Sequence, residues 1–407
     1  MKGAPLAGTL SFLLPEPAET ALLHVCLSPA RAREAWSEWT RLGGDLDRYR
    51  SLLPQVDEGA RKGGLELDEP LAALLSGARL HESLRLNAIR EIAGEVLDRL
   101  AANRLDPVIV QDLALAETVY PDPALRHCHA LELLLPPDAI AGARTALGAD
   151  LARTGGFPVR LAVRPLAHVV LGASASGVLA RAVDAEIAGR RARVPAIEDA
   201  LLLVLGRAAV GGERRTLLWA CDAARAIEAA PEIDWDIVAV AAGDWGLGIP
   251  VAAMLGWLAS ELGAPVPIAA IERIARIPPR GPGRGRAVEA ALECVRADGR
   301  AKPGSLLARS AGWRERANVL RWTTLPSTDR MRRSFPGAPR ATLPVLYAAR
   351  PILYAARWTL SSLNRRRRHP GAGRGSRVPG DGTAAARSGS RSMHAADRPS
   401  ASPRSWG

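Results

Sequence analysis

The stretch PVIVQDLALAETVYPDPALRHCHALELLL, at residues 107–135, constrains the fold of this chain more than any other feature. Asp106-Pro107 ends the helical pattern before it, and PVIV has the length and apolar character of a short buried strand. DLALAETVY predicts a helix of about two turns, PDPAL a turn, and CHALELLL a second strand. This order of elements predicts a small α/β unit.

Helical patterns flank this stretch on both sides. Residues 17–105 are predicted to be mostly helical, and residues 138–154 to form a helix that precedes one or two strands at 157–172. The helix just before the stretch carries an apolar stripe at largely i, i+3 and i+4 spacing, made of Leu84, Leu86, Ile89, Ile92, Val96, Leu97 and Leu100. We expect residues 1–80 to form an N-terminal helical region and residues 81–175 the α/β core.

The sequence after the α/β core is predicted to be helical. Four segments between about 195 and 275 are apolar on one face and are separated by Gly and Pro. Residues 276–310 are rich in Pro, Gly and Arg and predict a loop, after which we expect two helices that contain Trp313 and Trp322. The predicted fold is therefore α+β and rich in α-helix, with residues 195–335 as a helical domain.

The positive charge of the chain is concentrated at its C-terminal end. Of the formal net charge of +12, the segment from Arg365 to Gly407 carries +8, with ten Arg and two Asp. This segment is also rich in Gly, Pro and Ser, so residues 364–407 are predicted to be a disordered basic tail. Because the rest of the chain is close to charge balance, we expect no specific nucleic-acid partner.

Residues 343–363, LPVLYAARPILYAARWTLSSL, are predicted to form an amphipathic helix. The segment is long enough to span a bilayer, but Arg350, Pro351 and Arg357 lie inside it, and arginines within a membrane are costly. Two interpretations stay open. The helix packs on the helical domain, or it lies on an anionic membrane surface that also attracts the basic residues after it.

Cysteine usage and the N-terminus both favour a cytoplasmic protein. The four cysteines are far apart and have no metal-ligand spacing, which predicts reduced, buried thiols at Cys26, Cys128, Cys221 and Cys294. The N-terminal apolar run is short and broken by prolines, so it is a poor signal peptide. Binding of residues 343–368 to lipid would make the protein peripheral at the membrane.

The second strand of the α/β unit can present carboxylates to a metal ion. Nucleotidyl transfer needs divalent metal ions beside the triphosphate, and acids two residues apart on a strand can hold them because alternate side chains share a face. Ala130, Glu132 and Leu134 share one face, and only Glu132 among them is acidic. The other face carries His129, Leu131, Leu133 and Leu135.

In these residues the chain resembles bacterial nucleotidyltransferase-like proteins of the polymerase-beta type fold, which are often associated with polysaccharide gene clusters. The shared frame is a short apolar strand, a helix that ends in Tyr120, a Pro-Asp-Pro turn, Arg126, and Glu132 at the second acidic position. LLWACDAARAI matches a further family pattern through Trp219 and Asp222.

The resemblance covers about residues 80–335 and carries expectations for fold and activity. It implies a small nucleotidyltransferase-like mixed sheet flanked by helices, followed by a helical C-terminal domain. It also implies transfer of a nucleotidyl group from an NTP, with Mg²⁺ as cofactor.

Several positions depart from the family pattern. Gln111-Asp112 stands where the family has lysine and glycine, and Ala130 stands where it has its first acid. Gly206 is the nearest candidate for a replaced family histidine. A single Glu132 carboxylate is a weak anchor for Mg²⁺, and each lost group that stabilises transition-state charge commonly costs about 10²–10³ in rate.

Three hypotheses follow. The first is a catalytically degenerate nucleotidyltransferase without cofactor, which acts as a binding or assembly component linked to polysaccharide biosynthesis. The second is an active Mg²⁺-dependent enzyme, with Glu132 and Asp112 as catalytic acids, Glu132 as metal ligand, and Gln111 and Arg126 in contact with the nucleotide. The third is a membrane-surface protein that binds through residues 343–368.

Local sequence also offers structural roles for the acids near this site. Asp112 begins a helix, where an acid most often caps backbone N–H groups. Asp122 lies in a Pro-Asp-Pro turn, where it is usually structural, and Glu117 lies in the middle of the short helix. A metal site that uses one of them as a relocated ligand would need to override these roles.

Overall fold

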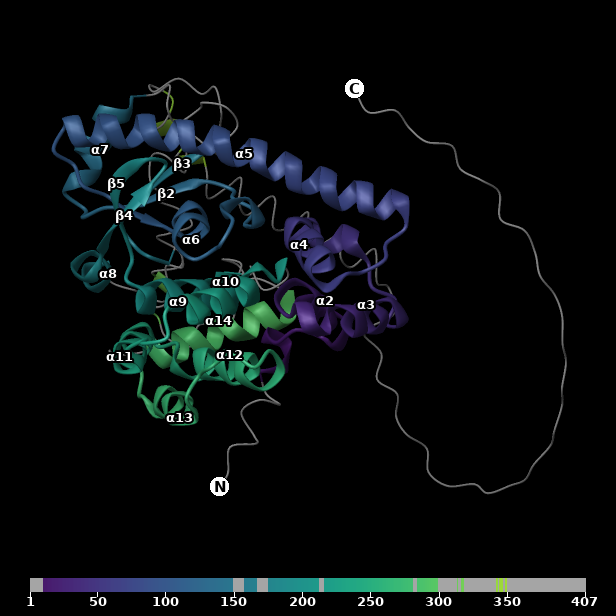
Figure 1. The fold of residues 1–407 in the computed structure, drawn as a ribbon. Coiled ribbons are helices and arrows are strands. Elements are labelled where there is room, and N and C mark those ends of the chain that lie inside the picture. The colour runs from purple at the N-terminus through teal and green to yellow at the C-terminus, as the bar shows by residue number, and fades with distance from the viewer. Residues whose placement is uncertain are drawn as a thin grey trace, which may run out of the picture. The chain divides into compact units, whose positions relative to one another are not determined.

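A computed structural model describes residues 10–148, 157–166, 175–211, 216–280 and 284–298, and single positions between 313 and 349. The described residues lie in one compact unit, Met1–Pro351. They form a mixed α/β structure that is mainly helical, as the sequence predicts. Figure 1 shows one sheet with helices on both of its sides.

Short helices make up the N-terminal region, as predicted. In chain order they are η1 (Ser11–Leu13), α2 (Pro17–Leu27), η2 (Pro29–Arg31), α3 (Ala32–Arg41), η3 (Leu46–Leu52) and α4 (Leu53–Gly63). A capping box between Glu16 and Glu19 begins α2. At Gly59 of α4 a Cβ would lie 1.8 Å from the carbonyl oxygen of Val25, so a glycine lets α4 approach the α2 backbone.

One long helix, α5 (Glu69–Ala102), joins the N-terminal region to the sheet (Figure 1). The Asp68 carboxylate caps its start by accepting a hydrogen bond from the Leu71 N–H at 2.9 Å. α5 packs on α4 at one end and on the sheet at the other, so the predicted boundary at residue 80 falls inside a helix. Leu84, which was assigned to the apolar stripe, is instead 63% exposed. The stripe residues that are buried are Leu86, Ile89, Val96, Leu97 and Leu100.

Within the described residues, five strands form one mixed sheet. They are β1 (Val108–Val110), β2 (Leu131–Leu134), β3 (Val159–Ala162), β4 (Val183–Ile187) and β5 (Arg190–Val194), in the order β3-β2-β1-β5-β4. β1 is antiparallel to β2 and parallel to β5, β2 is parallel to β3, and β4 is antiparallel to β5. The predicted strands at β1, β2 and β3 are confirmed.

Three short helical elements connect the first strands. They are α6 (Asp112–Thr118), η4 (Pro123–Leu125) and α7 (Ala139–Leu147). The predicted helix after PVIV and the turn at PDPAL are confirmed. The remainder of the helix that was predicted for 138–154 lies outside the described residues.

The two faces of the sheet belong to different hydrophobic cores. Ile109, Leu131 and Leu133 pack with residues of α5 and α7. Val110 and Leu134 belong to the larger core, which also contains residues of the N-terminal and C-terminal helices. The alternation predicted for the second strand is therefore confirmed, and Glu132 shares the Leu134 face.

The hairpin of β4 and β5 was not predicted. Its turn is formed by Ala188 and Gly189, which both have positive φ, 53° and 72°, as a two-residue hairpin turn requires. Its strands carry charged residues where most buried strands carry apolar ones, so no apolar run reveals them. Because β5 lies between β1 and β4, the sheet extends to Val194, past the predicted core boundary at 175. A short helix, α8 (Ser176–Arg181), precedes the hairpin.

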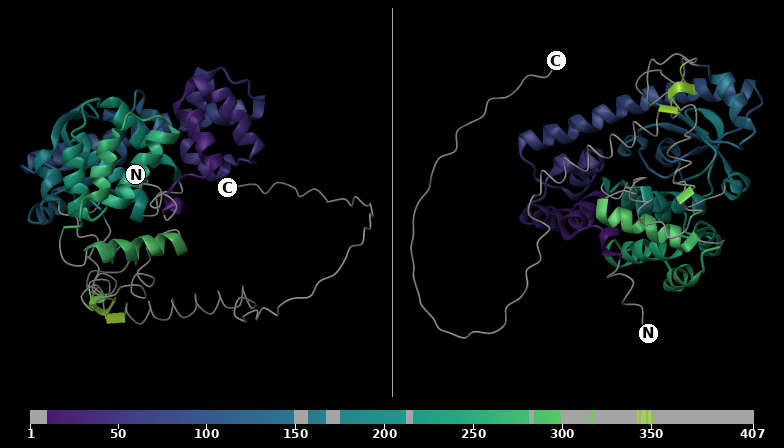
Figure 2. Two further views of the ribbon diagram at one scale, coloured as in Figure 1. Left: turned by 90° about the horizontal axis from the view of Figure 1, so that it is seen from below. Right: turned by 180° about the vertical axis from the view of Figure 1, so that it is seen from behind.

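The sequence after the sheet is helical, as predicted. Its elements are α9 (Ile197–Gly206), the π-helical turn η6 (Arg207–Gly211), α10 (Leu218–Ala229), α11 (Trp235–Trp245), α12 (Gly248–Glu261), α13 (Ile268–Arg276) and α14 (Arg284–Asp298). α14 corrects the prediction of a loop at 276–310 for residues 284–298, where the apolar side chains are buried. Of the rest of that range the structure describes residues 276–280, and those after the end of α13 at Arg276 are in no helix or strand, as predicted. Figures 1 and 2 show the N-terminal helices, in purple, beside the teal and green helices of this region.

Several predictions concern residues that the structure does not describe. The tail at 364–407 and Trp322 lie outside the described residues, and so does most of the segment 343–363. None of the helices in the described part of the chain is both long enough and apolar enough to cross a membrane.

Candidate functional site

Asp112, the first residue of α6, lies beside the start of β2. Its Oδ2 accepts hydrogen bonds from the backbone N–H groups of His129 (2.7 Å) and Ala130 (3.2 Å). Its Oδ1 accepts one from Nη1 of Arg126 at 2.7 Å. The side chain is 15% exposed. Both carboxylate oxygens are therefore engaged, and the aspartate joins α6 to the segment that leads into β2.

The electrostatics of this site keep Asp112 ionised. Burial acts to raise the pKa of its carboxyl group. The positive charge of Arg126 and the hydrogen bonds from His129 and Arg126 outweigh that effect and lower the pKa to about 2. The charge of Arg207 contributes in the same direction, which shows that this second arginine acts on the same site.

Arg126 lies at the centre of a buried network that reaches the helical region. Its Nη2 and Nε donate to the two carboxylate oxygens of Asp222 on α10, at 2.8 and 3.2 Å. The Tyr120 hydroxyl donates to the same carboxylate at 2.7 Å. The side chains of Arg126 and Asp222 are only 5% and 3% exposed. Burial acts to lower the pKa of Arg126, but the charges of Asp222 and Asp112 raise it above its usual value.

The network ties the sheet to the helices. Nη1 of Arg126 also donates to the His127 carbonyl oxygen at 2.7 Å, so the described contacts of the guanidinium all lead to protein groups. The predicted contact between Arg126 and a nucleotide stays a prediction, and in this conformation the arginine holds Asp112 and Asp222 together.

Glu132, the predicted metal ligand, forms an ion pair with Arg207. Nη2 of Arg207, at the start of the π-helical turn, donates to Oε2 of Glu132. The two side chains are 13% and 14% exposed, with Glu132 the less exposed. Val110 of β1 is the register partner of Glu132, so the carboxylate projects beside the end of β1. A guanidinium group thus lies against the carboxylate that was expected to hold Mg²⁺.

Gln111 connects β1 to α6 with a strained backbone, φ 66° and ψ −135°. This region of backbone conformation is unfavourable for residues other than glycine. The side chain is buried, and its Nε2 has no hydrogen-bond partner among the described residues. A cavity of about 10 Å³ lies against it, with space for roughly one water molecule and not for a nucleotide.

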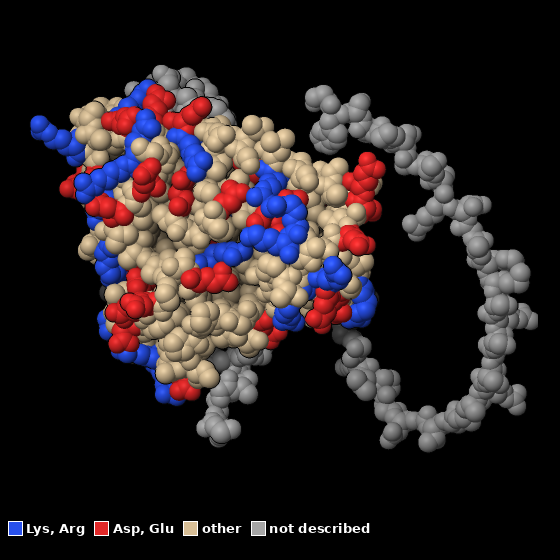
Figure 3. Space-filling view, in the orientation of Figure 1, with Lys and Arg blue, Asp and Glu red and all other residues tan. Residues whose placement is uncertain are grey.

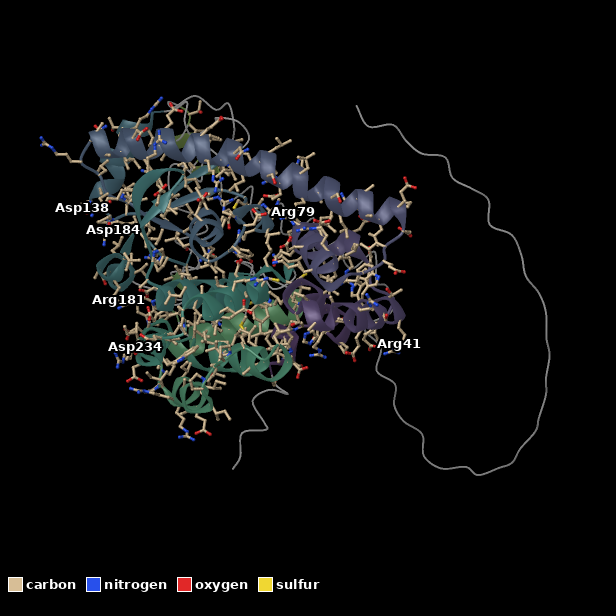
Figure 4. The ribbon with its side chains drawn as sticks, in the orientation of Figure 1. Arg41, Arg79, Asp138, Arg181, Asp184 and Asp234 are labelled. Atoms are coloured by element: carbon tan, nitrogen blue, oxygen red, sulfur yellow. The ribbon has the colours of Figure 1, made fainter. Side chains whose placement is uncertain are left out.

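The other acids near the site have structural partners. Asp122 accepts a hydrogen bond from the Ala124 N–H (3.0 Å) and one from Arg79 of α5 (2.7 Å). Arg79 also pairs with Glu58 of α4, and Figure 4 shows it between α5 and α4. Glu117 accepts from Nε of Arg90 at 2.6 Å. The structural role weighed for Asp122 agrees with this geometry. Asp112 is structural too, but not as the helix cap that was weighed for it: α6 has no side-chain cap, and the Asp112 carboxylate accepts from His129 and Ala130 instead.

The arrangement brings two carboxylates and two arginines together where β1 ends and β2 begins, in the middle of the sheet. Asp112 is paired with Arg126 and Glu132 with Arg207, so the positive charge that Mg²⁺ would supply is already present. Across the part of the chain that the structure describes, no group of three or more Cys, His, Asp and Glu side chains could hold a metal ion.

Arg207 and the role of Asp222 were missed from the sequence. Arg207 interrupts the apolar run ALLLVLGRAAV, and a charged residue in a buried helix needs a partner. That signal could have identified Arg207 as paired, although not its partner 75 residues away. Asp222 was noted only as part of a pattern, and its contacts with Tyr120 and Arg126 become visible in the tertiary structure.

A larger cavity, of about 460 Å³, lies between α8 and α11. It is lined by apolar residues of α11 and by Arg181, Asp236 and Asp244. Arg181 pairs with the fully buried Asp199, and Asp236 and Asp244 pair with exposed arginines. None of the predicted site residues lines this cavity.

Comparisons of the chain with protein families, with curated proteins and with solved structures find no match.

Proposed function

We propose that this protein is a nucleotidyltransferase-like protein that has lost catalysis and acts as a binding or assembly component, linked to polysaccharide biosynthesis as the resemblance implies. The observation that carries the proposal is the ion pair between Arg207 and Glu132. A carboxylate that is neutralised by a fixed guanidinium offers Mg²⁺ little, because the metal would have to displace a charge already in place.

The distribution of kept and lost residues supports this proposal. Tyr120, Arg126 and Asp222, which match the family frame, form the buried network between sheet and helices. Gln111 and Ala130, which depart from it, stand at the positions where the family has its lysine and its first acid. The frame residues that hold the fold together are present, and those that would carry charge to the triphosphate are replaced.

Thermal-shift titration with each NTP, with and without Mg²⁺, tests the proposal. A ligand that binds the native state at 100 times its Kd stabilises it by roughly 2.7 kcal/mol, which is readily measured. We expect no Mg²⁺-dependent stabilisation of the wild-type protein. A clear shift with one NTP that requires Mg²⁺ would contradict the loss of the metal site.

A restored variant makes the experiment sharper. Gln111→Lys, Ala130→Asp and Arg207→Ala together return the lysine and the first acid and release Glu132. Mg²⁺-dependent NTP binding by this triple variant would show that only the charged groups were lost, whereas no binding would show that the space for a nucleotide has been lost as well. Arg273→Ala, which removes an arginine from an exposed ion pair with Asp236, is the matched control and should behave as the wild type.

One observation favours a second candidate, an active Mg²⁺-dependent nucleotidyltransferase. The Asp112 carboxylate lies within 3.2 Å of the Ala130 N–H, next to the position where the family has its first acid. Asp112 and Glu132 could then act as the pair of metal ligands once Arg126 and Arg207 release them. If the protein is active, NTP with Mg²⁺ should stabilise the wild type and should not stabilise Glu132→Gln. A wild type that NTP does not stabilise would rule out the active enzyme.

A further inference from the structure

The cavity between α8 and α11 has the size and the lining of a ligand-binding site. Its volume of about 460 Å³ lies in the range of small-molecule sites, which combine a largely apolar wall with a few polar groups. α11 supplies Ile237, Val240, Ala241 and Trp245 to this wall, and α8 supplies Val178. The polar groups of the lining therefore decide which ligand fits.

Arg181 offers this cavity a fixed hydrogen-bond donor. Its Nε and Nη2 donate to the two carboxylate oxygens of Asp199, at 2.9 and 2.6 Å, and Asp199 is fully buried. Both N–H groups of Nη1 are left without a hydrogen-bond partner among the described residues. A Cβ at Gly177, which also lines the cavity, would lie 3.3 Å from Nη1. The glycine therefore leaves room for the guanidinium group, and Asp199 holds that group ready for an anion.

Asp244 of α11 offers an acceptor in the same cavity. Its Oδ1 accepts a hydrogen bond from Arg280 at 3.3 Å, whereas its Oδ2 has no partner within the described part of the chain. The hydrogen bonds to Asp199 raise the pKa of Arg181 above its usual value, and the charge of Asp244 acts in the same direction. Arg181 and Asp244 are thus near enough to interact, yet among the described residues they form ion pairs with other groups. A ligand can lie between them.

The charges around the cavity are balanced. Figure 3 shows acidic and basic side chains interspersed at the edge of the molecule where Figure 1 labels α8 and α11. A simple amine in the cavity would meet the like charge of Arg181, and a simple carboxylate would meet that of Asp244. A ligand that carries both groups avoids this repulsion. Each charged side chain of the lining has a partner of opposite sign, in the pairs Arg181–Asp199, Asp236–Arg273 and Asp244–Arg280.

We propose that this cavity binds a free amino acid with an apolar side chain. The ligand carboxylate accepts hydrogen bonds from Nη1 of Arg181, and the ligand ammonium group donates to Oδ2 of Asp244. The apolar side chain of the ligand lies against Val240 and Ala241, which line the same wall. Asp236 lies eight residues before Asp244, about 12 Å along α11, and is therefore beyond the reach of the same ammonium group.

The exposure of the two charged groups limits the affinity. The side chains of Arg181 and Asp244 are 36% and 48% exposed, and ion pairs that water reaches contribute little. We therefore expect a Kd on the order of 100 µM. Glu132 and its neighbours do not line the cavity, so amino-acid binding is independent of the loss or retention of nucleotidyl transfer.

Isothermal titration calorimetry of the full-length protein with L-leucine, L-methionine and L-phenylalanine is the first test. We expect at least one of the three to bind with the stated affinity. Isoamylamine and isocaproate, the analogues of leucine without its carboxylate and without its ammonium group, should bind at least tenfold more weakly than leucine or not at all. Glycine, which lacks the apolar side chain, should also bind more weakly. No binding of any of the three amino acids, or equal binding of leucine and either analogue, would overturn the proposal.

Substitutions on α11 test the ammonium site. Asp244→Asn removes the charge that faces the ammonium group and should raise the Kd for the tightest-binding amino acid about tenfold. Asp236→Asn is the matched control, because it changes an exposed acid of the same helix that also pairs with an exposed arginine. At about 12 Å its charge is largely screened, so its Kd should stay within about twofold of the wild-type value. Equal effects of the two substitutions would overturn the proposal.

The Arg181→Lys variant tests the carboxylate site. Lysine keeps a positive charge beside the buried Asp199, so the variant should stay folded, which circular dichroism checks. Its single nitrogen replaces the planar guanidinium group, however, and no second nitrogen is left for the ligand. We expect the variant to lose the preference for leucine over isoamylamine. An Arg181→Lys variant that keeps a tenfold preference would overturn the assignment of Arg181 and the proposal with it.

Discussion

At the scale of single residues, Arg126 donates hydrogen bonds to Asp112, to Asp222 and to the His127 carbonyl oxygen. It joins Asp112, which begins α6, to Asp222, which belongs to α10. Both partners are acids in places with little solvent, and a buried carboxylate without a cation is costly. Arg126 therefore links the start of α6, next to the sheet, to α10 in the helical region.

Replacement of Arg126 by methionine should reduce the free energy of unfolding by about 3–5 kcal/mol, because two buried carboxylates would lose their counter-charge. Urea unfolding at pH 7 measures this loss. Arg50→Met, which removes an exposed ion pair with Asp47, is the control and should change stability by less than about 1 kcal/mol. A loss below 1 kcal/mol for Arg126→Met would show that the network does not hold the fold together.

The pH dependence of stability should carry the signature of Asp112. Its pKa is about 2 in the folded protein, against 3.8 for an ordinary aspartate. Because the folded value is the lower one, ionised Asp112 stabilises the protein above pH 4 by about 2 kcal/mol. That contribution is lost as the pH falls from about 4 towards 2.

The Asp112→Asn variant isolates this contribution. We expect it to be less stable than the wild type at pH 7, and the difference to shrink as the pH is lowered through 4. Urea unfolding in steps from pH 7 to pH 3 would show this. Asp138→Asn, which changes an exposed acid at the edge of the molecule (Figure 4), is the control and should have little effect on stability. If the difference in stability between Asp112→Asn and the wild type did not change with pH, the pKa of Asp112 would not be lowered in the folded protein.

At the scale of elements, the contact between α2 and α4 depends on the absence of one side chain. The Cβ of any other residue at Gly59 would lie 1.8 Å from the carbonyl oxygen of Val25. That oxygen belongs to a helix backbone and cannot rotate away. Gly256, in the middle of α12, is also a helical glycine, but a Cβ there would meet only Ile271 at an ordinary 3.9 Å.

These two glycines should respond in opposite directions to alanine. Gly59→Ala should destabilise the protein by about 3 kcal/mol, because α2 and α4 must separate. Gly256→Ala should stabilise it by about 0.5–1 kcal/mol, because alanine is the better helix former and meets no clash. Thermal and urea unfolding of both variants checks the pair. Equal effects of the two substitutions would mean that helix propensity alone decides the outcome at both sites.

At the scale of the whole molecule, the larger hydrophobic core contains residues from almost every part of the described chain. It includes Leu22 of α2, Leu75 of α5, Val110 of β1 and Leu255 of α12. The Arg126–Asp222 ion pair crosses the same region. A core shared in this way gives each part of the chain little stability of its own.

We therefore expect the described part of the chain to unfold in one cooperative transition. Tryptophan fluorescence reports mainly on helices outside the sheet, since Trp39, Trp219, Trp245 and Trp257 lie there, whereas backbone circular dichroism reports on all elements. The two signals should change at the same urea concentration. Two separated transitions would show that the sheet and the helices are independent domains, as the sequence boundaries at 175 and 195 suggested.

Local pattern by itself determined the elements between residues 107 and 135 and the helical character of the flanking regions. Apolar periodicity is a property of neighbouring residues, so the alternation of Leu131, Glu132, Leu133 and Leu134 could be predicted and is confirmed. The hairpin of β4 and β5 and the helix α14 were not predicted, since charged strands and a preceding Pro-Gly-Arg segment obscure their patterns.

Only the tertiary structure decided which charges meet. Glu132 and Arg207 are 75 residues apart, and Arg126 and Asp222 are 96 apart. Nothing in the local sequence of either partner specifies the other, because packing of the sheet against α9 and α10 determines which side chains share a buried site. Asp112 and Glu132, which suggested a metal site when only the sequence was considered, are paired with Arg126 and Arg207 in the folded chain. This pairing, which depends on packing, is the physical basis for proposing a protein that binds and assembles without catalysis.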